Sequence, residues 1–368
     1  MEFLERTYFY DKNMLKDEIV PLAGNCHEQL IAIVMKNILK NKDINYSNLF
    51  LRDLSFYVRV ANNNFLRSSI KGNITFDKNM YTCLDIKIKN DGKKSVYLMD
   101  KMLDKNGYVI FRTVDAMLPF SVYYNDKFHD MRDFKESGHV MMMIGRDEKY
   151  YYFVDQLSEL NLKKMMHPRK RPDIGMYEKE KFQKVFEKCL IIENVIFKES
   201  YLQSINELNN SLIKTSIKRY YNNEYKVTND IFIRTYASKG EIIGGRQALL
   251  WICKYLLNKT NDLRDKVYCV TQNTLTRFDA FWELKNGLTG IIYSKKALLY
   301  FLQEKKTCIE PLILSVKQNI ESWEKLRNII IKNYYSKRYN TGNHYLEYVN
   351  LVIQFEDNLF KLLRAYYL

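Results

Sequence analysis

Proline is scarce in this sequence, and long apolar runs are missing. Five prolines in 368 residues argue against a disordered tail, and an apolar fraction of 46% is ordinary for a globular protein. No stretch approaches the ~18 consecutive apolar residues that cross a bilayer. The first residues, MEFLERTYFYDKNMLKDE, lack the apolar core of a secretory signal. We therefore expect a soluble, cytoplasmic protein with no membrane partner.

Paired cysteines of the CxxC type are also missing, so the spacing of a zinc site is absent. An even number of cysteines in a long cytosolic chain does not indicate a disulfide framework. The expectation is a protein with no bound metal. The six cysteines are Cys26, Cys83, Cys189, Cys253, Cys269 and Cys308.

Acidic residues are too few to balance the basic ones. The chain has 58 Lys and Arg against 43 Asp and Glu, a formal net charge of +15. Frequent Lys, Asn and Ile are typical of A/T-rich coding, which explains part of this excess. The remaining positive field favours an acidic partner, either nucleic acid or an acidic carrier protein. No zinc-finger, RNP or basic-helix signature supports nucleic acid.

The chain up to residue 162 alternates between helical and strand patterns. Apolar spacing predicts a helix over 28–40, and GYVIFRTV predicts a strand over Gly107–Val114. The segments MYTCLDIKIK and KSVYLMDKML predict a strand and the start of a helix. VMMMIGRDEKYYYFVD predicts a β-hairpin around a polar turn, Gly145–Lys149.

Two prolines and a basic cluster in Lys163–Lys181 then interrupt the pattern and predict a domain boundary. We expect an α+β domain over residues 1–162 and an α-helical domain over residues 176–368. The segments that predict helices beyond the boundary are EKFQKVFEKCL, YLQSINELNNSLIKTSIKRYY, GRQALLWICKYLL, SVKQNIESWEKLRNIIIKNYY and HYLEYVNLVIQFEDNLFKLLRAYYL.

One cysteine stands where a loop meets a predicted helix. Cys26 follows the turn-prone PLAGN and precedes the apolar run of the 28–40 helix. Backbone N–H groups and the dipole at a helix start favour a thiolate. The alternative is a structural cysteine, because most cysteines pack in cores as small hydrophobes.

A base and an orienting acid are predicted in the hairpin. His139 lies eight residues before Asp147 and Asp155 lies eight after it, so a hairpin symmetric about Asp147 pairs the two. Opposed residues have Cβ atoms ~4.5–5.5 Å apart on one face. A carboxylate on one imidazole nitrogen leaves the other free for a thiol. Alternatively His139 is a core residue and Asp155 a strand end, and a one-residue register slip would separate them.

Three stretches carry a resemblance to a known family: GNCHEQLIAIVMKNIL, VIFRTVDAMLPF and SGHVMMMIGRDEKYYYFVD. Together they resemble the N-terminal domain of the butirosin biosynthesis protein H family. That resemblance implies a papain-like, C39-related fold, with Cys26 as nucleophile, His139 as base and Asp155 as orienter. Family members take an acyl group from a carrier-protein thioester and pass it to an amine. Amide-forming synthases of polythioamide assembly share this architecture.

The resemblance also implies the partners and leaves the oxyanion site open. No bound cofactor is expected, because the phosphopantetheine arm of an acyl or peptidyl carrier protein supplies the acyl group. C39 peptidases carry a glutamine shortly before the cysteine, whereas DEIVPLAGN here has none. Asn25 and, less directly, Gln29 are the side-chain candidates, beside the Cys26 backbone N–H. Asp115 is a candidate for binding a cationic amine, with a plain strand-end acid as the alternative.

The expected function is therefore amide-bond formation from a carrier-bound thioester in natural-product biosynthesis, with an amine or diamine acceptor and no nucleic-acid partner. The first alternative is a C39-like cysteine peptidase or amidase, in which water replaces the amine. The second is a non-catalytic basic binding module. The pair of glycines before Arg246 opens a predicted helix and suits either a pantetheine phosphate or a plain helix cap.

Overall fold

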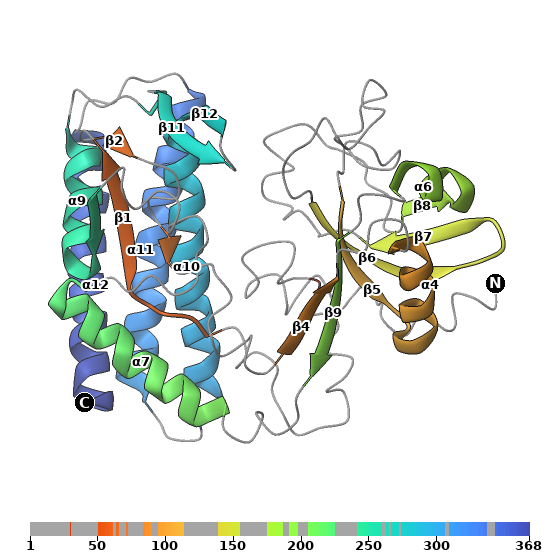
Figure 1. The fold of residues 1–368 in the computed structure, drawn as a ribbon. Helices are drawn as coiled ribbons and strands as arrows, with labels where there is room; N and C mark the ends of the chain where they lie inside the picture. The colour runs from red at the N-terminus through yellow and green to blue at the C-terminus, as the bar shows by residue number, and fades with distance from the viewer. Residues whose placement is uncertain are drawn as a thin grey trace. The chain divides into compact units, whose positions relative to one another are not determined.

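The computed structural model of the chain is a mixture of helices and antiparallel sheets, as the α+β expectation requires (Figure 1). Contacts divide it into two compact units, the first comprising Met1–Tyr46 and Tyr81–Leu202 and the second Ser47–Met80 and Gln203–Leu368. The structure describes residue 30 and residues 51–61, 64–65, 71–72, 84–89, 95–113, 139–154, 175–186, 191–197, 205–224, 241–258, 263–264, 266–271, 274–305, 309–336 and 343–368.

A six-stranded antiparallel sheet forms the centre of the first unit. Neighbouring strands are joined in the order β4-β9-β5-β6-β7-β8, so strands that are distant in sequence lie next to each other. The strands are β4 (Leu84–Lys89), β5 (Val109–Thr113), β6 (His139–Arg146), β7 (Tyr150–Val154), β8 (Gly175–Glu178) and β9 (Ile191–Phe197).

Apolar side chains on this sheet pack against two helices, α4 (Ser95–Asn106) and α6 (Lys179–Phe186). In β6, Met141, Met142 and Met143 are all buried, so this strand is covered on both faces. The ring of Phe182 on α6 lies 5.3 Å from those of Tyr151 and Phe153, between ring centroids. These aromatic contacts hold α6 on the sheet.

Five of the described helices build the second unit: α7 (Ile205–Asn222), α9 (Gly245–Leu257), α10 (Ala280–Glu304), α11 (Glu310–Tyr335) and α12 (Asn343–Tyr367). In Figure 1, α10, α11 and α12 run beside one another, and α10 and α12 both pack on α11. A proline in the first turn of α11 suits the helix start, where its missing N–H is not needed. None of the described helices has the length and apolar content needed to span a membrane.

Small antiparallel sheets accompany these helices. One is built on β1 (Phe56–Ala61), which pairs with β10 (Glu241–Gly244) on one side. On its other side β1 pairs with two short strands, β2 (Asn64–Phe65) and β3 (Lys71–Gly72). The second sheet is a hairpin of β11 (Lys266–Thr271) and β12 (Thr274–Asp279).

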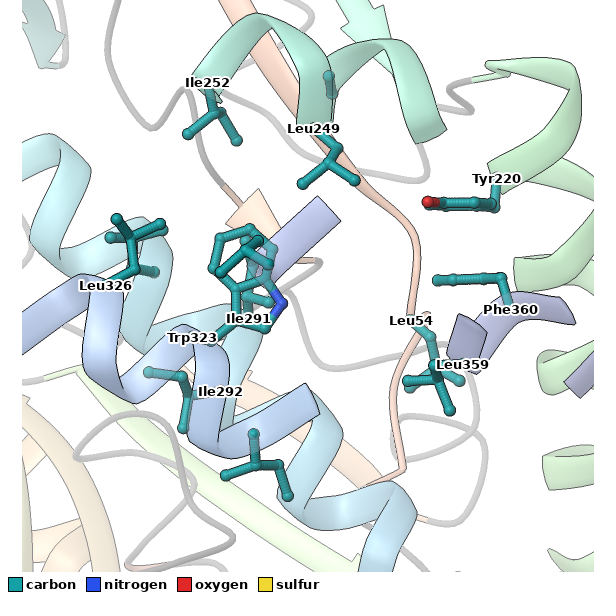
Figure 2. Packing of buried hydrophobic residues seen from close by; sticks show 14 of the residues in the cluster. Leu54, Tyr220, Leu249, Ile252, Ile291, Ile292, Trp323, Leu326, Leu359 and Phe360 are labelled. Carbon is teal, nitrogen blue, oxygen red and sulfur yellow. The ribbon is translucent and has the colours of Figure 1, made fainter. Parts of the chain in front are cut away.

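Large side chains fill the core of the second unit, and Figure 2 shows part of it. Trp323 of α11 is fully buried beside apolar residues of α9, α10 and α12. The rings of Tyr220 and Phe360 stack face to face, with centroids 3.7 Å apart and planes 3° from parallel. Burial of each such side chain contributes about 2 kcal/mol.

The division of the chain differs from the expected one at residues 163–181. β8 lies within that segment and β9 beyond it, yet β8 pairs with β7 and β9 lies between β4 and β5. Residues 47–80 belong instead to the second unit, which contains strands as well as helices. Prolines and charges mark local breaks in structure, whereas strand pairing between distant segments decides which unit a segment joins.

Candidate functional site

The β6–β7 hairpin has a closed end and an open end. At the closed end, Asp147 Oδ1 accepts hydrogen bonds from the backbone N–H groups of Lys149 (2.7 Å) and Tyr150 (2.6 Å). The Tyr152 hydroxyl donates to the other carboxylate oxygen, and this bond, with those from the backbone, lowers the pKa of Asp147. Asp147 therefore stabilises the turn as a carboxylate.

At the open end, His139 is the first residue of β6. It pairs with Thr113, the last residue of β5, on one side. On the other side Val154, the last residue of β7, pairs with Met142. The end of β5, the start of β6 and the end of β7 thus lie at one end of three adjacent strands.

The register of the hairpin differs from the symmetric prediction. Met142 pairs with Val154, whereas symmetry about Asp147 would pair it with Tyr152. A β-bulge between Met143 and Gly145 adds a residue to β6, and Asp147 N–H closes the turn on Tyr150 O at 3.0 Å. The symmetric register is therefore wrong for the described pairs, whereas the opposition of His139 and Asp155 lies outside the described residues and stays a prediction. The offset from symmetry is three residues at Gly145 and Arg146 and, beyond the bulge, two residues at Met143 and Met142.

Most predicted site residues lie outside the described residues, and His139 is described by its backbone. The predicted residues outside the described ranges are Asn25, Cys26, Gln29, Asp115 and Asp155.

A second concentration of polar groups lies in the core of the second unit. Glu356 of α12 accepts a hydrogen bond from Lys295 Nζ at 2.6 Å, and neither side chain is exposed. Its other oxygen accepts from Asn319 Nδ2 (2.7 Å) and Trp323 Nε1 (2.8 Å) of α11. With both oxygens occupied and no exposure to solvent, this carboxylate joins three helices and is not available as a base.

The sequence contains a faint signal for this cluster that local reasoning missed. Lys295 follows Ile291 by four residues and Glu356 follows Val352 by four, so each charge falls on a buried apolar stripe. A charge on such a stripe needs a partner. The partner here is 61 residues away, which no local pattern identifies.

Cys253 of α9 is the cysteine whose side chain the structure describes, and it is 3% exposed. Burial, assisted by the charge of Glu356, raises the pKa of its thiol to about 12. A thiol of that kind is a poor nucleophile near neutral pH. Cys253 is therefore a core residue.

The glycine pair before Arg246 is occupied by protein contacts. A Cβ on Gly245 would lie 2.5 Å from Arg219 O, and one on Gly244 would lie 2.8 Å from Glu224 O. The backbone N–H of Gln247 donates to Asn223 Oδ1 at 2.8 Å. The start of α9 thus packs against the end of α7, which favours the helix-start alternative over a phosphate site.

The described residues contain no group of three or more His, Cys, Asp or Glu that is placed to hold a metal ion. The chain matches no protein-family model and no curated protein sequence.

Proposed function

We propose that this protein is a cysteine-dependent acyltransferase that forms an amide bond from a carrier-protein thioester. The observation that carries the proposal is the shared end of β5, β6 and β7. His139 begins β6 there. In the sequence, Asp155 directly follows Val154, the last residue of β7, and Asp115 follows Thr113, the last residue of β5, by two positions. A papain-like arrangement needs its base and its orienting acid on neighbouring strands, and this sheet supplies such strands.

The hairpin register is compatible with the proposed pair. We propose that the pairing, described as far as Met142 opposite Val154, continues by one residue. Asp155 would then stand opposite Met141 and diagonal to His139 on the same face. Diagonal neighbours on one face are ~7–8 Å apart, a separation that long side chains bridge. Asp155 would then orient the imidazole of His139 directly or through one water molecule.

In the proposed reaction, the Cys26 thiolate attacks the carbonyl carbon of the acyl thioester. The tetrahedral intermediate collapses, the carbon–sulfur bond to the phosphopantetheine arm breaks, and the arm leaves as a thiolate that takes up a proton. An amine then attacks the acyl-enzyme while His139 accepts its proton, and Cys26 leaves as a thiolate. Asn25, Gln29 and the Cys26 N–H are the candidate donors to the oxyanion.

The proposed acyl donor is an acidic acyl or peptidyl carrier protein, and the acceptor is an amine or diamine in non-ribosomal-peptide-like biosynthesis. The net charge of +15 favours an acidic partner. Asp115 is the proposed contact for a cationic amine. Electrostatic docking predicts that transfer from a carrier-bound donor falls with salt more steeply than transfer from a small soluble thioester.

Intact-mass measurement after incubation with a soluble acyl-pantetheine thioester tests the proposal. Wild type and Cys83→Ala, the matched cysteine control, should each gain one acyl group, and Cys26→Ala should gain none. Added amine should release the group faster than water does. Release by water as fast as by amine would favour the peptidase or amidase alternative. An unmodified wild type would favour a non-catalytic binding module.

A further inference from the structure

A short irregular segment is buried in the second unit. Leu51–Ser55 forms neither helix nor strand, yet the exposed fraction of each of its five residues is 8% or less. It leads directly into β1. Irregular backbone is seldom buried, because its polar groups then lack both water and secondary-structure partners. We call Leu51–Ala61, this segment together with β1, the strap.

Residues of α7 and α10 supply those partners. The backbone N–H of Leu54 donates to Ser216 Oγ of α7 at 2.9 Å. The backbone carbonyl of Leu54 accepts a longer hydrogen bond, 3.4 Å, from Lys295 Nζ of α10. The same lysine forms the buried ion pair with Glu356, so the strap is connected to that ionic cluster.

The strongest contact of the strap is made by a buried acid. Asp53 forms an ion pair with Arg219 of α7, and their side chains are 3% and 14% exposed. Its Oδ1 also lies 2.8 Å from Ser216 Oγ and accepts from the backbone N–H of Ser55 at 2.9 Å. A buried carboxylate that accepts hydrogen bonds from this many donors is held in one specific position by them.

Apolar side chains and strand pairing complete the fit. Leu51, Leu54 and Val58 belong to the core cluster of the helices, and Figure 2 shows Leu54 beside Leu359 of α12. β1 adds β10 as an antiparallel neighbour, from Tyr57 opposite Gly244 to Val60 opposite Glu241. Strand addition combined with side-chain pockets is how many proteins bind extended peptides.

We propose that the strap is an internal peptide ligand by which the C-terminal helices hold the N-terminal part of the chain without a covalent bond. The chain crosses between the two units three times, at 46/47, 80/81 and 202/203. The crossing at 202/203 is the covalent link from β9 to α7. If that link is cut, the strap, with β2 and β3 paired beside it, should keep the C-terminal piece attached.

A specific protease site inserted between Phe197 and Ile205 of the full chain tests this proposal. After complete cleavage the two pieces should co-elute in gel filtration in native buffer and separate in denaturant. An excess of a synthetic peptide with the sequence of Leu51–Ala61 should speed their separation in native buffer. Pieces that separate at once, while circular dichroism still reports their helices, would overturn the proposal.

Variants of α7 identify the contact responsible. In the cleavable chain, Arg219→Ala should raise the dissociation constant of the two pieces on the order of a hundredfold, because it leaves a buried carboxylate without its cation. Lys214→Ala removes an exposed cation from the same helix and should change it little. If Arg219→Ala does not fold, Ser216→Ala is the second variant, and it should weaken association by about tenfold. If Arg219→Ala and Ser216→Ala give the same dissociation constant as the control Lys214→Ala, specific recognition of the strap is contradicted.

Discussion

Lys295 of α10 and Glu356 of α12 form an ion pair with a 2.6 Å separation, and both side chains are 0% exposed. Lys295 Nζ also lies 4.8 Å from the centroid of the Phe360 ring. Removing two charges from water is costly, and a buried pair recovers that cost only when its remaining hydrogen-bonding atoms have partners. The donors Asn319 and Trp323 meet this need for the carboxylate.

Loss of one charge of this pair should destabilise the protein strongly. We expect Lys295→Met and Glu356→Gln each to lower the free energy of unfolding by about 3–5 kcal/mol, because each leaves an uncompensated buried charge. The double variant should lose less than the sum of the two single losses. Urea unfolding followed by circular dichroism measures all three values.

The matched control for this pair is Lys325→Met on α11. Lys325 and Glu321 form an ion pair of similar length, 2.8 Å, but their side chains are 53% and 64% exposed. Its removal should leave stability almost unchanged. Equal losses for Lys295→Met and Lys325→Met would show that the buried pair is solvated in solution.

Replacing Gly245 should destabilise the protein more than replacing Gly107, another glycine with positive φ. The φ of Gly245 is 56°, and a Cβ there would lie 2.5 Å from Arg219 O and 2.6 Å from Tyr220 O. Gly245→Ala should therefore cost about 1–2 kcal/mol for backbone conformation and about 1–3 kcal/mol more for the steric clash. Gly107, with φ 75° and an exposed position, provides the comparison. Thermal unfolding of the two alanine variants should rank Gly245→Ala as clearly less stable.

Asp357 should make stability depend on acid pH. Its hydrogen bonds from Arg246, and then from the Tyr220 hydroxyl, lower its pKa below the ordinary value of 3.8. A carboxyl with a lowered folded-state pKa adds stability above its unfolded pKa, and this stability is lost as pH falls through the folded value. Because Arg246 and Asp357 are 42% and 35% exposed, the contribution is at most about 1 kcal/mol.

Comparing the wild type with Asp357→Asn isolates this effect, since other acids titrate equally in both. The difference in their free energies of unfolding should be largest near neutral pH and shrink as pH falls below 3.8. A difference that stays constant across the acid range would contradict the assignment.

Cys253 should be unreactive in the folded protein. With a pKa of about 12 against an ordinary 9.0, and an exposed fraction of 3%, its thiolate is scarce and shielded. Iodoacetamide labelling near neutral pH, followed by peptide mass spectrometry, should leave Cys253 unmodified in native buffer and modify it in denaturant. Under the proposed mechanism Cys26 is labelled rapidly in the same native sample. Rapid native labelling of Cys253 would show that the α9 core opens.

Local patterns in the sequence predicted several elements because a helix or hairpin depends on neighbouring residues. Apolar spacing indicated α7, α9, α11 and α12, and the structure confirms helices in each segment. The strand at Gly107–Val114 and the hairpin that follows were also indicated, and β5, β6 and β7 occupy them. Apolar spacing did not identify α10, whose residues are buried around much of the helix and leave a weak polar face.

Other features arose only from tertiary structure. The hairpin register depended on a bulge between Met143 and Gly145, and one added residue changes every pair beyond it. The proposed catalytic pair therefore depends on a geometric detail that counting residues does not supply. Cys26 and Asp155 lie outside the described residues, and their catalytic roles stay predictions.

The sequence by itself determined where most helices and the hairpin form, because these follow from apolar spacing within one segment. Only the tertiary structure decided that Leu51–Ser55 is buried among helices that follow it by more than a hundred residues. It also decided that Lys295 meets Glu356 across the core. Such contacts depend on how distant segments pack, and packing joins residues whose separation along the chain leaves no periodic signal.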